Sequence, residues 1–218
     1  MTWLLLQLAD SAFPTGGFAH SGGLEAAVQL GAVDGPEQLE RLAAEALWST
    51  AWGALPFVAA AHQAPDRLLA LDAACDATLP GHVANRASRA LGAAFLRAAS
   101  EALGAPAAAL AEEVRRAGAP GHLAPAFGAV LGRLETSLEE VRRLYLFQAV
   151  RALVSAGVRL GAAGPLEAQA LLARLAPEAE AALRASEGCP PEEACGAAPL
   201  LDLLQGQQDR LYSRLFQS

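Results

Sequence analysis

The feature that most constrains the fold is the near absence of the alternation of apolar and polar residues that a strand requires. Between Gly and Pro residues, the chain consists of long segments rich in Ala, Leu, Glu and Arg. These residues are strong helix formers. With 53% hydrophobic residues in a chain of 218, one domain can bury a sizeable core. The sequence therefore predicts an all-α, single-domain helical bundle of about eight to ten helices.

Gly and Pro residues set the expected helix ends, because both interrupt helices. The main breaks fall at Gly35-Pro36, Pro80-Gly81, Gly104-Ala105-Pro106 and Gly164-Pro165. We expect helices over residues 23–30, 37–63, 66–77, 82–103, 107–117, 123–135, 137–161, 166–175 and 177–186.

Charge and hydropathy exclude several classes of protein. The formal net charge of -7 argues against nucleic-acid binding, which needs clustered cations. Residues 46–65 carry no charge, a length that would allow a membrane span. Pro56, His62, Gln63 and many alanines favour instead a central helix of a soluble bundle, kinked or broken at Pro56. The N-terminus lacks a basic leader, so we expect a cytoplasmic protein with no membrane segment.

The predicted helix 137–161 is the most informative one. Glu139 and Arg143 stand four residues apart with the acid first, which favours a surface ion pair. After Arg143, apolar residues occupy nearly every face. A helix of this kind is buried on all sides. The pattern leaves open whether it lies at the bundle centre or partly faces a second subunit.

The segment from Leu8 to Glu25, which we call the signature loop, is not helical in pattern. Glycines and a proline frame Phe13, Phe18 and His20, and Ser21 or Gly22 would cap the helix that follows. The loop lacks the Lys-Ser/Thr of a phosphate-binding loop, and Ser21 beside His20 forms no Gly-x-Ser-x-Gly elbow. The four histidines and three cysteines show no zinc-site spacing. We therefore predict a structured turn, with no catalytic and no metal-binding residue.

The C-terminal segment carries a second signal. Residues 189–199 are typical of a linker, and residues 200–218 end in Leu, Tyr, Arg and Phe residues. If this end is helical, Leu211 stacks on Leu215, and Tyr212 on Phe216. A flexible tail with aromatic and Arg residues would suit docking of a partner. The alternative is a last helix that folds back on the core. We divide the chain into a helical domain, 1–188, and a linker and partner-docking tail, 189–218.

Two long motifs resemble those of one family. Residues 5–25, Leu-Leu-Gln-Leu-Ala-Asp-Ser-Ala-Phe-Pro-Thr-Gly-Gly-Phe-Ala-His-Ser-Gly-Gly-Leu-Glu, resemble the N-terminal signature of UreF, a urease accessory protein, nearly residue for residue. The closing Leu-Tyr-Ser-Arg-Leu-Phe-Gln-Ser of residues 211–218 also resembles a UreF block. Weaker similar blocks lie between them in the right order, at residues 85–92, 122–128 and 154–159.

The resemblance implies a non-catalytic adaptor or chaperone in urease maturation. UreF proteins are all-helical dimers that bind the accessory protein UreD, also called UreH, and recruit the GTPase UreG. The assembly docks on apo-urease for nickel insertion. The resemblance thus implies no cofactor of the chain's own, since nickel and GTP act through UreG.

Individual residues match family positions. The resemblance implies that Phe18 serves in complex formation, that Arg214 is needed to bind UreD and hence UreG, and that Trp3, Arg143 and Phe147 pack a homodimer. The full set assigned to partner binding is Phe18, His20, Tyr212, Arg214, Leu215 and Phe216. Two departures stand out. Gln208-Asp209 replaces the usual His-Glu, and Ala162-Ala-Gly-Pro165 replaces a Pro-Leu-Gly-Gln run.

Overall fold

The computed structural model describes residues 3–218, and these residues form α-helices and short 3-10 turns with no strand. The all-α class is confirmed. The helices, in chain order, are α1 (Trp3–Ala9), α2 (Leu24–Gln29), α3 (Pro36–Gly53), α4 (Leu55–Gln63), α5 (Leu68–Thr78), α6 (His82–Ala102), α7 (Ala105–Ala117), α8 (Leu123–Arg133), α9 (Leu138–Arg159), α10 (Pro165–Ala185) and α11 (Pro199–Gly206). The 3-10 turns are η1 (Gly17–Ala19), η2 (Pro65–Arg67), η3 (Pro191–Glu193) and η4 (Gln208–Arg210).

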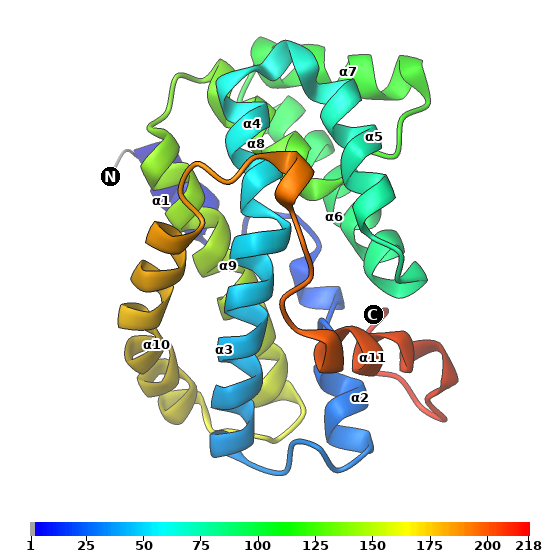
Figure 1. Ribbon diagram of the computed structural model, residues 1–218, viewed down its shortest axis with the longest axis vertical. Coiled ribbons are helices and arrows are strands. Elements are labelled where there is room, and N and C mark those ends of the chain that lie inside the picture. The colour runs from blue at the N-terminus through cyan, green and yellow to red at the C-terminus, as the bar shows by residue number, and fades with distance from the viewer. Residues whose placement is uncertain (1–2) are drawn as a thin grey trace.

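Helices α4, α8 and α9 connect two groups of helices. In the first group, α3 and α10 lie beside α9, as Figure 1 shows. In the second group, α5, α6 and α7 pack around α8. Every residue of α8 from Ala124 to Leu131 is buried, so α8 is the innermost helix. Its Gly128 and Gly132 stand one turn apart against the backbone of α4, which lets these two helices approach closely.

Helix α9 lies mostly at the bundle centre. It contacts α1, α2, α3, α4, α8 and α10, and it buries Leu144, Leu146, Val150 and Val154. Phe147 is an exception, with 44% of its surface exposed. The apolar residues on most faces of α9 are therefore explained within one chain, and Phe147 alone among these large side chains projects outward.

Several expected helix boundaries are corrected. The expected helix 37–63 is interrupted between Gly53 and Leu55, and Pro56 lies in the first turn of α4, so the expected break is confirmed. The two expected helices 166–175 and 177–186 are one helix, α10, which continues through Pro177. Packing explains this, since α10 buries Leu171 and Leu175 before the proline and Ala182 and Leu183 after it.

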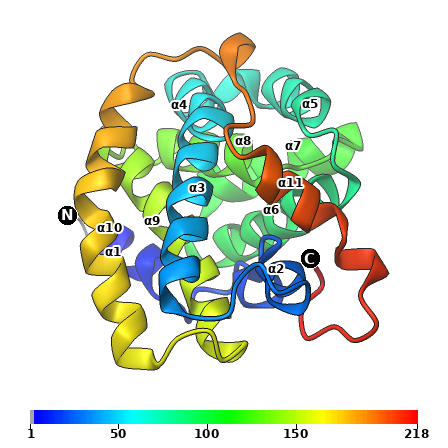
Figure 2. The same ribbon diagram turned by 60° about the horizontal axis from the view of Figure 1, so that its bottom comes forward.

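The C-terminal segment folds back on the bundle. Of the two alternatives, a flexible tail and an end packed on the core, the structure shows the second. The amide of Cys195 donates to the carbonyl of Trp52, and Ala198 and Leu201 are buried. Helix α11 ends at Gly206, so the helical stacking of Leu211 on Leu215 does not occur. Figure 2 shows the last residues returning beside α2. The flexible tail that we expected is thus packed, while the domain boundary at residue 188 stays a prediction.

Among residues 3–218, no helix combines the length and hydropathy that crossing a membrane requires.

Candidate functional site: the loop–tail surface

The signature loop is anchored in the core by an aromatic chain. Phe13 is buried, and its ring centroid lies 6.4 Å from that of Phe95 on α6. Phe95 in turn contacts Phe127 of α8 at 5.1 Å, and Phe127 meets Tyr145 of α9 edge-on at 5.3 Å. Because aromatic contacts of this length stabilise a core, the first half of the loop is held against α6 and, through Phe95, is joined to the aromatic residues of α8 and α9.

Backbone turns place the second half of the loop. Gly22 and Gly23 have φ values of 62° and 92°, which favour glycine. Gly23 is the N-cap of α2, so the expected cap at Ser21 or Gly22 is wrong by one position. Ser21 still serves the helix start, since its Oγ accepts the amide of Glu25 at 3.3 Å. The turn leaves Ser21 and Glu25 buried, facing the C-terminal segment.

The last residues of the chain pair with this loop. The amide of Gln217 donates to the carbonyl of Ala19 at 2.8 Å, and the amide of Ser21 donates to the backbone oxygen of Ser218 at 2.5 Å. Ser21 Oγ donates to the same oxygen at 2.9 Å. His20 Nδ1 and Ser218 Oγ lie 2.6 Å apart, within hydrogen-bond distance. Burial and the nearby Arg86 lower the pKa of His20 below its ordinary value.

An arginine from α9 joins the loop to the tail. The guanidinium carbon of Arg159 lies 3.5 Å from the ring centroid of Phe18 and 4.2 Å from that of Phe216. Arg159 Nη1 also donates to the carbonyl of Phe18. A cation over two aromatic rings is favourable, and more so where it is partly desolvated. Arg159 therefore links the loop, the tail and the C-terminal end of α9.

Asp209 attaches the tail to α6. Its two carboxylate oxygens accept from Arg86 at 2.8 and 3.0 Å, and Oδ2 lies 3.1 Å from His82 Nε2. The guanidinium of Arg86 lowers the pKa of Asp209 below its usual range. Asp209 Oδ1 also accepts from Arg214 at 3.3 Å. The residue that departs from the usual Glu therefore positions Arg214.

The structure separates the six residues assigned to partner binding into two groups. Phe18, Tyr212 and Leu215 are exposed by 72%, 104% and 56%, and Arg214 is exposed as well. We call these four residues the loop–tail surface. Phe216, by contrast, is 3% exposed, and His20 is half-buried. The last two support the surface from beneath.

The residues assigned to a dimer interface lie elsewhere. Trp3 on α1 is 83% exposed, and Phe147 on α9 is the exposed residue described above. Arg143 donates to Glu180 on α10 at 2.8 and 3.0 Å and to Glu139 at 3.1 Å. These carboxylates raise the pKa of Arg143. The expected Glu139–Arg143 pair is thus confirmed, and Arg143 also joins α9 to α10.

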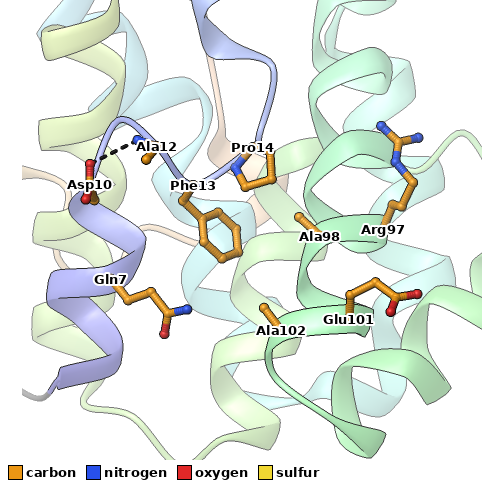
Figure 3. A pocket seen from close by; sticks show the side chains of 9 residues that line it. All are labelled: Gln7, Asp10, Ala12, Phe13, Pro14, Arg97, Ala98, Glu101 and Ala102. Carbon is orange, nitrogen blue, oxygen red and sulfur yellow. Dashed lines mark hydrogen bonds between the residues drawn. The ribbon is translucent and has the colours of Figure 1, made fainter.

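A groove lies between the front of the signature loop and α6. Its volume is about 540 Å³, and Figure 3 shows Phe13 and Pro14 facing the α6 residues Ala98 and Ala102 across it. Arg97 and Glu101 come from the same helix. The groove is lined by none of the four residues of the loop–tail surface.

Sequence reasoning missed a buried polar network under α8. Asp72, with none of its surface exposed, accepts the amides of Gly121 and His122 at 2.8 and 2.6 Å. The ring of His122 lies 3.0 Å from Ser88 Oγ and 2.9 Å from Asp76 Oδ1. Both ring nitrogens are thus occupied, and the network closes the contact of α5, α6 and α8. An isolated His in the sequence gave no signal for it.

Reasoning from sequence also missed Glu25, Gln208 and Arg159. Gln208 is fully buried, and its Nε2 donates to Glu25 Oε2 at 2.7 Å. The available signals were the place of Glu25 at the end of the signature loop, the departure at Gln208 and the similar block 154–159, which ends in Arg159. Among residues 3–218, no group of three or more His, Cys, Asp and Glu side chains is arranged to hold a metal ion.

Comparison with known proteins identifies the family. The family model UreF matches residues 33–176, which exclude both the signature loop and the tail. Urease accessory protein F of Arabidopsis thaliana is 40% identical over 221 aligned residues, covering 99% of this chain and 92% of the relative. The rice protein of the same name, from Oryza sativa subsp. indica, is 37% identical, with coverages of 98% and 84%. UreF of Rhizobium meliloti is 30% identical, with coverages of 100% and 94%. The chain therefore belongs to the UreF family of urease accessory proteins.

Proposed function

We propose that this chain is a non-catalytic adaptor that binds UreD (UreH) and recruits the GTPase UreG for nickel insertion into apo-urease in the cytoplasm. The family supports a role in urease maturation. In this proposal, nickel and GTP act through UreG, and the chain supplies binding surfaces only. UreD docks on the loop–tail surface, and a homodimer forms around Trp3, Arg143 and Phe147.

The observation that carries the proposal is the exposure of large side chains on a firmly held segment. Tyr212 and Leu215 are exposed, while the backbone beside them is bound to the signature loop and α2. Tyr and Arg residues are frequent anchors of interfaces. A segment whose backbone is already held in place loses less conformational entropy on binding than a flexible one. The surface therefore suits a protein partner.

The side chains that a hydrolase would need are occupied by the tail. Ser21 is 1% exposed, and its hydroxyl hydrogen-bonds the backbone oxygen of Ser218. His20 lies against the hydroxyl of Ser218 rather than against Ser21. These contacts support a structural role for Ser21 and His20, as the adaptor proposal requires.

The test is co-purification with the cognate UreD, followed by addition of UreG. The variants are Tyr212→Ala, Arg214→Ala and Leu215→Ala, and the control is Leu166→Ala, which removes an 89% exposed leucine on α10. Truncation of an interface anchor costs about 2 kcal/mol or more, so we expect affinity for UreD to fall about 30-fold or more. The control should bind as wild type does. Wild-type affinity in all three tail variants would refute docking of UreD on this surface.

The homodimer is tested separately by light scattering after gel filtration. Phe147→Glu places a charge beside Arg151, whose guanidinium lies 5.8 Å from the Phe147 ring. The substitution removes a large apolar side chain and takes a carboxylate out of water at the interface, a desolvation cost that attraction to Arg151 does not repay, so the variant should be a monomer. Leu200→Glu on α11, where Leu200 is 65% exposed, is the control and should stay dimeric. A dimeric Phe147→Glu protein would exclude this interface.

A further inference from the structure

One buried carboxylate collects hydrogen bonds from the tail. Glu25 lies in the first turn of α2 and is only 2% exposed. Its Oε1 accepts the amide of Leu215 at 2.5 Å, and its Oε2 accepts the amide of Phe216 at 3.1 Å and Nε2 of Gln208 at 2.7 Å. A buried carboxylate is costly without such donors. All three donors come from the C-terminal segment.

The orientation of Gln208 shows that the arrangement favours the tail. Gln208 is fully buried, and its Nε2 also donates to the carbonyl of Phe216 at 3.2 Å. Its Oε1 is buried without a hydrogen-bond partner in the part of the chain that the structure describes. An unpaired buried acceptor costs free energy. The Gln208 side chain thus leaves its Oε1 without a hydrogen bond, while its Nε2 joins Glu25 to the tail backbone.

The carboxylate also decides which tail side chains face outward. Its two oxygens hold two successive backbone amides, those of Leu215 and Phe216, and so define the direction of the chain at this point. Residues 215 and 216 lie in a bend, a backbone form in which two successive amides can face one carboxylate, so their side chains leave the chain in different directions. Phe216 accordingly turns inward, with 3% exposure, and Leu215 outward, with 56%.

We infer that Glu25 is a positioning residue. It fastens the tail and so determines which side chains the loop–tail surface presents to its partner. Glu25 itself is buried, so it acts through Leu215 and its neighbours rather than by touching the partner. The identity of the partner rests on the proposed function, whereas the fastening of the tail does not. The two parts can therefore be tested separately.

The first measurement is amide hydrogen exchange of the full chain carrying Glu25→Gln, with the exchange rate of each amide measured by NMR. Glutamine offers one acceptor oxygen in place of two, and its NH2 group would face the amide donors of the tail. Hydrogen bonds to a charged group contribute enough that the exchange rates of the Leu215 and Phe216 amides should rise about tenfold or more. Amides of α8 should exchange as in wild type. Unchanged exchange at Leu215 and Phe216 would overturn the inference.

Two further variants keep the test decisive. Glu37→Gln removes the same charge from an exposed residue in the first turn of α3 and should leave tail exchange unchanged. If Glu25→Gln does not fold, Glu25→Asp replaces it, because aspartate keeps the charge but is one methylene shorter, so its oxygens no longer reach the amides of both Leu215 and Phe216. Faster exchange at Phe216 in that variant supports the inference, and wild-type exchange overturns it.

The second measurement is the affinity of Glu25→Gln for UreD. Faster tail exchange together with an affinity loss of about tenfold or more supports positioning of the surface by Glu25. Faster exchange with wild-type affinity overturns the claim that fastening matters for docking. Loss of affinity in Tyr212→Ala, measured alongside, shows independently whether UreD uses the loop–tail surface at all. Failure of the inference is thus distinguished from failure of the proposed function.

Discussion

The close approach of α4 and α8 makes Gly128→Ala a sharp test of the fold. A Cβ atom added at Gly128 would lie 2.2 Å from the carbonyl oxygen of Val58, and one at Gly132 would lie 2.2 Å from that of His62. Cβ atoms essentially never approach other atoms within 3.0 Å. Since the obstacle is helix backbone in both places, no side-chain rotation relieves the overlap. Helices α4 and α8 must separate instead.

The magnitude follows from the size of the overlap. The helices must move apart by roughly 1 Å, and overpacking of this kind costs about 1–3 kcal/mol. Alanine recovers up to about 1 kcal/mol through its higher helix propensity. The obstacle is rigid, and α8 is buried from Ala124 to Leu131, so we expect a net loss near 2 kcal/mol. For a chain of this length, that corresponds to a Tm lower by about 4–8 °C.

The assay is thermal and urea unfolding followed by far-ultraviolet circular dichroism. Gly206→Ala is the matched control, because no heavy atom lies within 4 Å of its added Cβ and its φ is not positive. The control should be neutral or slightly stabilised. A Tm of Gly128→Ala within about 1 °C of wild type would refute the argument that α4 and α8 are in backbone contact at this position.

Three further predictions concern other parts of the molecule. Asp72→Asn leaves one acceptor oxygen for the amides of Gly121 and His122, so the free energy of unfolding in urea should fall by about 1.5–3 kcal/mol, and an unchanged midpoint would contradict this. Burial raises the pKa of Cys75 to about 12, so a thiol reagent should modify exposed Cys195 in the folded protein and Cys75 only after unfolding. Rapid labelling of Cys75 in a folded Cys195→Ser variant would contradict this prediction. Arg86 lowers the pKa of Asp209, and Asp209 also contacts His82 and Arg214. The ionised carboxylate therefore stabilises the attachment of the tail fully above about pH 4, and this stabilisation is lost as the pH falls through the lowered pKa. Amide protection factors of the tail should show this loss, and Arg86→Ala should shift it to higher pH.

Several elements were accessible from the sequence because they depend on neighbours along the chain. The ends of α5, α6, α7, α8 and α9 follow Gly and Pro positions to within a few residues. The rule that proline interrupts a helix also predicted the break before Pro56. Where tertiary packing opposes a local rule, prediction failed. Helix α10 continues through Pro177 because its apolar residues on both sides of the proline are buried, and Trp48 Nε1 donates to Glu178 at 2.8 Å.

The candidate site was predictable only in part. The motifs pointed to both segments, and the structure brings the two together, which neither segment predicts alone. The exposure of Tyr212 and the burial of Phe216 depend on which way the tail backbone turns. That direction is decided by hydrogen bonds to Glu25, whose donors are separated from it by 183 to 191 residues.

By itself, the sequence determined the helical class, most helix boundaries and the two motifs whose resemblance pointed to the family. Helix formation and its interruption are governed by residues within a few positions of each other, so they can be inferred locally. Only the tertiary structure decided that the tail is packed, that Glu25 fastens it and that Phe18, Tyr212 and Leu215 face outward. Burial and the pairing of buried polar groups depend on residues distant in the chain, and these are brought together by folding alone.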